Sequence, residues 1–118
     1  MLLIVDDDPH FLEQAMQLLN SGKGLFIARD AQQAKELMGS VGAAFSLVLV
    51  DLDLPGQDGF SLIQEMRAAF PDLPVIAVSG VCKRDVLESA KLVGAADALP
   101  KPIDDTWNLA IAKARATH

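Results

Sequence analysis

A few polar side chains in this sequence stand directly after short apolar runs, and their types are those that bind metal ions and anions. Runs of this length, rich in β-branched and large side chains, are typical of strands buried on both faces of a parallel sheet. Open α/β sheets bind ligands at the carboxyl ends of their strands, so polar residues delivered there point to function. The residues in these positions are Asp6, Asp7, Asp51, Ser79 and Lys101.

The three aspartates favour a divalent cation if their strands are neighbours in the sheet. Carboxylates held close together repel one another and raise each other's pKa values unless a cation lies among them. Hard oxygen ligands of this kind suit Mg²⁺, or Mn²⁺; Mg²⁺ needs only one or two direct carboxylates and completes its octahedron with water and phosphate oxygens. Asp6, Asp7 and Asp51 are therefore the predicted metal ligands.

Ser79 and Lys101 extend this cation site into a phosphoryl-transfer site. The metal and the Lys101 ammonium would neutralise a phosphoryl group, while the Ser79 hydroxyl and a backbone amide would bind its remaining oxygens. Asp51 is the natural nucleophile, because a carboxylate can attack phosphorus in line and form an aspartyl phosphate. We therefore predict catalytic roles for Asp51, Ser79 and Lys101.

Composition excludes several other classes of protein. The length of 118 residues predicts a single domain over residues 1–118. The one cysteine, Cys82, excludes an internal disulfide and suits a reducing cytoplasm. Apolar runs of at most about six residues are far shorter than the roughly 20 that cross a bilayer, and a net charge of −6 opposes direct binding of nucleic acid. We expect a cytoplasmic domain that contacts neither membrane nor nucleic acid.

Strand and helix patterns alternate five times along the chain. Pro9 fits the first helical position after an Asp8 cap, and Phe11, Ala15 and Leu18 form the predicted core stripe of that helix. The predicted strands cover residues 2–5, 25–28, 45–50, 75–78 and 98–99. The predicted helices cover residues 9–20, the segment from an Asp30 cap to Gly39 and Gly42, residues 59–69 after an Asp58 cap, 83–93 and 104–116.

Five strands that alternate with five helices predict a doubly wound α/β sandwich, (βα)5, with right-handed crossovers. Two strand orders are common in such sheets. The flavodoxin-like order 2-1-3-4-5 is favoured because it makes the strands that end at Asp6 and Asp51 neighbours at the switch point. Residues 25–28 are the least apolar run, which predicts an edge strand.

Four short motifs occur at the ends of predicted strands: VDDD at residues 5–8, LDLPGQDG after Asp51, VSG at 78–80 and LPKP at 99–102. Each motif is weak alone, but together and in this order they are highly specific. From its first residue to its last, the chain resembles the receiver domain of two-component response regulators.

The resemblance implies a role for each residue that matches the family's motifs. Asp51 would be the phosphorylated residue, and Asp6 and Asp7 would be the acidic pair that binds Mg²⁺. Asp53 would give its backbone carbonyl to the metal.

The same resemblance gives roles to residues that follow the last two strands. Ser79 would be the hydroxyl that turns toward the phosphoryl group, and Lys101 would be its counter-charge. The peptide bond between Lys101 and Pro102 is expected in the cis form, which proline makes accessible at a cost of about 0.5 to 1 kcal/mol.

Family behaviour implies a signalling function. A histidine kinase or histidine phosphotransfer protein would donate the phosphoryl group to Asp51, and the modified domain would change conformation to control an output or pass the phosphate on. A phosphoryl group adds up to about −2 charge beside Lys101 and Ser79, which favours the arrangement that draws both groups in. Such a domain labels itself without turnover of an external substrate. Family members often form homodimers through the face of the fourth and fifth helices.

One position departs from the family pattern. Many members have an aromatic residue three positions before the lysine, and its rotation reports phosphorylation to the fourth and fifth helices. Ala98 stands there in this chain, and a methyl group has no rotamers to change. Our hypothesis is that output relies on movement of the loop after Ser79, or that the domain chiefly passes phosphate on.

Two other functions fit parts of the pattern. The DLDL at residues 51–54 is similar to the DxD start of haloacid-dehalogenase-type phosphatases, but those enzymes place DxD near the chain start and normally carry a cap domain. A degenerate receiver would act only as a protein-interaction module, which the complete set of acidic, hydroxyl and lysine residues argues against. Turnover separates the first alternative, because a phosphatase releases many phosphates per chain and a receiver labels once.

Overall fold

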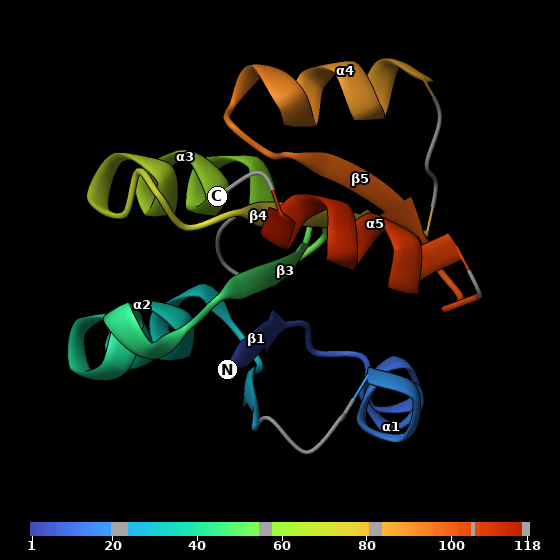
Figure 1. Ribbon diagram of the computed structural model, residues 1–118, viewed down its shortest axis with the longest axis horizontal. Coiled ribbons are helices and arrows are strands. Elements are labelled where there is room, and N and C mark those ends of the chain that lie inside the picture. Colours follow the sequence, from blue (N-terminus) through green and yellow to red (C-terminus); the bar gives the residue numbers. More distant parts are fainter. Residues whose placement is uncertain (20–23, 55–57, 81–83, 105, 117–118) are drawn as a thin grey trace.

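Five parallel strands form a sheet between two layers of helices (Figure 1). The computed structural model describes residues 1–19, 24–54, 58–80, 84–104 and 106–116. The strand order β2-β1-β3-β4-β5 confirms the predicted 2-1-3-4-5 order and the edge position of residues 25–28. The strands are β1 (Leu2–Val5), β2 (Leu25–Ala28), β3 (Leu47–Asp51), β4 (Val75–Ser79) and β5 (Asp97–Pro100).

Helices cover both faces of this sheet. In the described ranges, α1 and α5 pack on one face, and α2, α3 and α4 pack on the other (Figure 1). A short 3-10 turn, Gly42–Ala44, leads from α2 into β3. The helices are α1 (Pro9–Leu19), α2 (Ala31–Val41), α3 (Gly59–Ala69), α4 (Arg84–Leu92) and α5 (Thr106–Ala116).

The core explains why the polar residues collect at one edge. Successive side chains of a strand point to opposite faces, so Leu3 and Val5 pack with α2, α3 and α4, whereas Leu2 and Ile4 pack with α1 and α5. Every residue of β1, β3 and β4 is buried, as expected for central strands covered on both faces. Polar side chains enter these strands only at the last position of β3 and of β4.

Aspartates begin three of the helices, as predicted. The Asp8 carboxylate accepts hydrogen bonds from the backbone N–H groups two and three residues later, at 3.0 and 3.4 Å. Asp30 and Asp58 each accept one from the N–H group three residues later, at 2.8 Å. These carboxylates satisfy free amides at the positive ends of the helices, which fixes where each helix begins.

Around the turn between α2 and β3, the predicted role of Gly39 and the predicted start of β3 were wrong. Helix α2 ends at Gly42, as predicted, but Gly39 lies inside the helix and does not help to end it, because a single exposed glycine inside a helix costs only about 1 kcal/mol relative to alanine. Strand β3 begins at Leu47 and not at Phe45, because the Phe45 N–H donates to the Gly42 carbonyl, at 3.2 Å, and closes the 3-10 turn.

The first and last helices also differ from prediction in detail. Leu18, predicted in the core stripe of α1, is 59% exposed, because the buried face of this helix consists of Phe11, Leu12 and Ala15. Helix α5 begins at Thr106, whose N–H donates to the Asp104 carboxylate at 2.9 Å, so Asp104 precedes the helix. The predicted turn at residues 55–57 and the loop at 81–83 lie outside the described residues.

Gly59 starts α3 against the end of β3, and the position admits no side chain. A Cβ atom there would lie 2.3 Å from the Asp51 carbonyl oxygen and 2.5 Å from Leu52 Cα. These atoms belong to the backbone that carries Asp51, so they cannot rotate away. We expect Gly59→Ala to lower the free energy of unfolding by about 1 to 3 kcal/mol, the usual range for overpacking. Urea denaturation would measure it.

Gly39 provides the matched control for this substitution. A Cβ atom at Gly39 would meet no atom within 4 Å, and the residue lies inside α2. We expect Gly39→Ala to raise the free energy of unfolding by up to about 1 kcal/mol, because alanine favours the helix. If both variants changed stability equally, the close packing of Gly59 against β3 would be refuted.

Candidate functional site

The predicted site residues meet at the carboxyl edge of the sheet. Asp51 and Ser79 are the last residues of β3 and β4, and Asp6 and Lys101 directly follow β1 and β5. Strands β1 and β3 pair with Val5 opposite Val50, so their register places Asp6 beside Asp51. The strand order 2-1-3-4-5 therefore brings these side chains together.

Three carboxylates form an acidic cluster, defined as Asp6, Asp7 and Asp51. Each offers one oxygen, and these oxygens all lie within 4.8 Å of one another. Asp6 and Asp51 are buried, whereas Asp7 is exposed. Two backbone amides hold the buried pair: the Asp8 N–H donates to Asp6 Oδ1 at 2.9 Å, and the Asp53 N–H donates to Asp51 Oδ1 at 3.1 Å. The Oδ2 atoms of the pair are therefore turned toward Lys101.

Lys101 supplies a positive charge to the cluster. Its Nζ lies 2.8 Å from Asp6 Oδ2 and 3.5 Å from Asp51 Oδ2, and its side chain is 18% exposed. Asp6 Oδ2 is fully buried, and among the described residues the Lys101 ammonium is its one polar partner. A buried carboxylate oxygen with a single partner, beside two further carboxylates, belongs to a donor set that suits a divalent cation.

The electrostatics of the site follow from burial and charge together. Burial raises the pKa of Asp51, and the charge of Asp6 adds to this, while the Asp53 amide and Lys101 act in the opposite direction. Burial lowers the pKa of Lys101, but contact with Asp6 and the charges of Asp6, Asp51 and Asp8 outweigh it, so this pKa is raised overall. Lys101 therefore stays protonated, whereas the site disfavours the charged form of Asp51.

The remaining predicted residues lie around this cluster. Ser79 is buried, and its carbonyl accepts a hydrogen bond from the Lys101 N–H at 3.0 Å, which joins the ends of β4 and β5. The peptide bond between Lys101 and Pro102 is cis. Asp53 is exposed, and its backbone N–H donates to the Asp51 carboxylate. The predicted contact of its backbone carbonyl with a metal ion would be made in addition to this hydrogen bond.

An aromatic residue that the sequence marked only as core also reaches the site. Lys101 Nζ lies 4.6 Å from the centroid of the Phe11 ring, over its face. Phe11 in turn packs on Trp107, with ring centroids 5.6 Å apart. The helical spacing of Phe11 predicts burial correctly but gives no sign of the lysine, because Lys101 comes from the far end of the chain.

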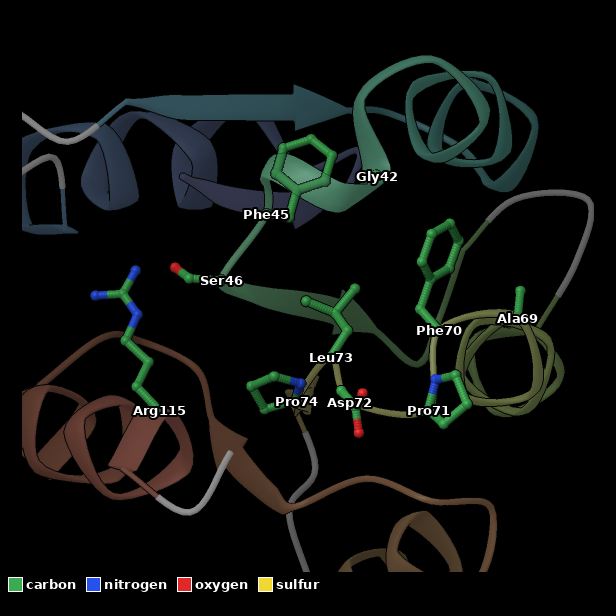
Figure 2. Close-up of a pocket in the computed structure, with 10 residues that line it drawn as sticks. All are labelled: Gly42, Phe45, Ser46, Ala69, Phe70, Pro71, Asp72, Leu73, Pro74 and Arg115. Atoms are coloured by element: carbon green, nitrogen blue, oxygen red, sulfur yellow. The ribbon is translucent and has the colours of Figure 1, made fainter.

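A separate pocket lies at the opposite edge of the sheet (Figure 2). Its volume is about 560 Å³, and mainly apolar residues line it, among them Phe45, Phe70 and Pro74. Ser46 and Pro74 stand just before β3 and β4, at the amino ends of these strands. No residue of the acidic cluster lines this pocket, so its size does not mark the chemical site.

Comparison with known proteins identifies the family. Residues 2–112 match the family model described as "Response regulator receiver domain". The chain belongs to this family. Its receiver fold is shared by the receiver domain of NtrX from Brucella abortus, which is 30% identical over the whole of both chains with a TM-score of 0.89. The phosphatase alternative is accordingly not favoured.

Curated relatives of this receiver domain are longer proteins. Response regulator protein FleR from Pseudomonas aeruginosa is 36% identical over 87% of this chain and 22% of its own length. The DNA-binding transcriptional regulator NtrC from Escherichia coli is 31% identical over 98% of this chain and 24% of its own length. The chain thus spans about a quarter of these relatives. Among the residues described, no helix is long and apolar enough to cross a membrane.

The raised pKa of Asp51 predicts the pH dependence of stability. When the pKa of an acid is higher in the folded state than in the unfolded state, the unfolded chain gives up the proton at a lower pH than the folded chain. The free energy of unfolding therefore falls as pH rises from the unfolded-state pKa to the folded-state pKa. Without divalent metal, we expect Asp51→Asn to be more stable than the wild type, by a margin that grows as pH rises above about 3.8, the ordinary aspartate value. Urea denaturation in EDTA at several pH values would measure the margin. A margin that shrinks with pH would contradict the assignment.

Proposed function

We propose that this receiver domain accepts a phosphoryl group on Asp51 and that residues 1–118 form one such domain. The observation that carries the proposal is the place of the Asp51 carboxylate, within 4.8 Å of the oxygens of Asp6 and Asp7 on one side and 3.5 Å from Lys101 Nζ on the other. Such an arrangement offers a cation site and a counter-charge to the same nucleophile. A degenerate receiver would have no need of it.

The acidic cluster would hold Mg²⁺, or Mn²⁺, with a further ligand from the Asp53 carbonyl. When bound, the ion would neutralise the carboxylates and the oxygens of an incoming phosphoryl group. The closeness of the three carboxylates, with oxygens within 4.8 Å of one another, supports this assignment. Metal-bound relatives support the ion's identity: one solved complex is titled CheX-CheY-BeF3-Mg²⁺ from Borrelia burgdorferi, at 23% identity, and another structure is the Mn²⁺-bound form of Rcp1, at 19%.

The transfer is a substitution at phosphorus. One Asp51 carboxylate oxygen attacks in line and forms the new P–O bond, while the P–N bond of a phosphohistidine donor breaks. The electron pair of the broken bond stays on the imidazole nitrogen, which takes up a proton. The Lys101 ammonium and the Ser79 hydroxyl bind phosphoryl oxygens, and no group is oxidised or reduced.

The donor would be a histidine kinase or a histidine phosphotransfer protein in the cytoplasm. A homodimer through the face of α4 and α5 is also proposed, and each of these helices carries an exposed leucine, Leu92 at 88% and Leu109 at 67%.

No nucleic acid or membrane contact is assigned to this domain. An output would belong to further parts of the protein, as the length of its relatives suggests. Ala98 is buried, and its methyl group has no rotamers to change. We therefore propose that output relies on movement of the loop after Ser79, or that the domain chiefly passes phosphate on.

Binding of Mg²⁺ should stabilise the fold through the acidic cluster. A ligand that binds only the folded state at 100 times its Kd adds about 2.7 kcal/mol, so we expect a clear rise in Tm with MgCl₂. Asp6→Asn should lose most of this rise, because it removes a buried ligand charge. Asp72→Asn is the matched control, since Asp72 is exposed at the opposite pocket (Figure 2). An equal rise in Tm for both variants would exclude the cluster as the site.

Phosphorylation is tested by intact mass after incubation with acetyl phosphate and Mg²⁺. We expect the wild type to gain the mass of one phosphoryl group, Asp51→Asn to gain none, and Lys101→Met to label about 100-fold more slowly, the scale for loss of one charge-stabilising group. Asp72→Asn should label like the wild type. Absence of label on the wild type, or equal label on Asp51→Asn, would refute the proposed function. Release of many phosphates per chain would instead indicate a phosphatase.

A further inference from the structure

We propose that Phe11 and Trp107 are positioning residues for Lys101, which together hold its ammonium at the acidic cluster. The inference rests on the proposed function, since it concerns the lysine that would bind the phosphoryl group. It assigns to two core aromatic residues a task beyond packing. Neither touches the predicted reacting atoms, so each would act through Lys101.

The first support is the face of the Phe11 ring. Lys101 Nζ lies 4.6 Å from its centroid, within the distance at which a ring quadrupole attracts a cation. Phe11 is 2% exposed, so the ring keeps water from that side of the ammonium. The ammonium is thereby bounded by an aromatic face on one side and by the Asp6 and Asp51 oxygens on another.

The second support is Trp107, which holds both the ring and the backbone. Its indole Nε1–H donates to the Pro100 carbonyl at 3.0 Å, one residue before Lys101. Its rings pack on Phe11 at 5.6 Å with an interplanar angle of 51°. Trp107 is completely buried. One residue of α5 therefore fixes the strand end from which Lys101 departs and the α1 ring against which its ammonium rests.

This support matters because a lysine side chain is flexible. Its four-carbon stem has many rotamers, and holding it in one place costs entropy unless neighbours exclude the others. Asp6 alone is a poor anchor for catalysis, since a cation bound at the acidic cluster would compete for the same Oδ2 atom. A neutral ring keeps attracting the ammonium when that carboxylate is engaged, so the charge stays placed for the phosphoryl group.

Aromatic side chains in a core often serve packing alone, and the variants are chosen to separate the two roles. Phe11→Leu keeps a large apolar side chain but removes the ring face, and Trp107→Phe keeps an aromatic ring but removes the N–H donor. Ile111→Val is the matched control, because Ile111 is buried in the same α1 and α5 cluster and makes no contact of this kind among the described residues.

Labelling with acetyl phosphate and saturating Mg²⁺ gives the first readout. We expect Phe11→Leu and Trp107→Phe to label about threefold to tenfold more slowly than the wild type, the scale of a lost cation–π contact for Phe11→Leu and of a lost hydrogen bond for Trp107→Phe. Ile111→Val should label at the wild-type rate. Far-UV circular dichroism would confirm that each variant is folded. Wild-type rates in both aromatic variants, or an equal loss in Ile111→Val, would overturn the proposal.

A spectroscopic readout needs neither metal nor phosphoryl transfer. Protons above an aromatic face are shifted upfield, so in ¹³C-lysine protein the Lys101 ε-CH₂ signal should lie upfield of the other lysines. It would be assigned by its loss in Lys101→Arg, and it should move to the common lysine position in Phe11→Leu. An unshifted Lys101 signal in the wild type would overturn the inference even if Phe11→Leu does not fold. Failure of the proposed function would appear separately, as a wild type that takes no label.

Discussion

Asp6 and Asp51 lie side by side at the ends of β1 and β3, and both carboxylates are buried. Burial of two like charges is costly, and the raised pKa of Asp51 expresses that cost. Lys101 offsets it in part, at 2.8 and 3.5 Å from the two Oδ2 atoms, but one ammonium faces three carboxylates once Asp7 is counted. The cluster thus retains an excess of negative charge, which attracts a divalent cation. The same charge repels an anionic phosphoryl group unless such a cation is bound.

The fold keeps these charges together by fixing the backbone on every side of them. The Asp6 N–H donates to the Ala28 carbonyl at 2.9 Å. This hydrogen bond extends the pairing with the edge strand β2 to the last residue of β2. The Gly59 N–H donates to the Leu52 carbonyl at 3.1 Å, and the close approach there allows α3 to begin immediately beside the strand that carries Asp51. Repulsion between the carboxylates therefore cannot be relieved by separating the strands, and it remains available to drive cation binding.

The chemistry of a few residues predicted the topology better than the periodicity predicted the boundaries. The order 2-1-3-4-5 followed from the need to bring Asp6 and Asp51 together, and that need acts on the whole sheet. Gly39 was misassigned because a helix tolerates one exposed glycine when its other residues pack, a balance that local sequence does not reveal. Phe11 was predicted as core, but its contact with Lys101 joins parts of the chain about 90 residues apart, which no local pattern records.

Ala98 lies on the opposite face of the sheet from Phe11 and Trp107. It is buried on the face of α2, α3 and α4, and its methyl group offers no alternative rotamer that could report a change at Ser79 to α4. From Lys101 the contacts through Phe11 and Trp107 run instead to α1 and α5, on the other face of the sheet. Close-packed interiors transmit displacements to whatever they touch, so a movement of the Lys101 ammonium would displace the residues of α1 and α5 that pack against it. Among the described residues, the aromatic contacts of Lys101 therefore lead to the α1 and α5 layer.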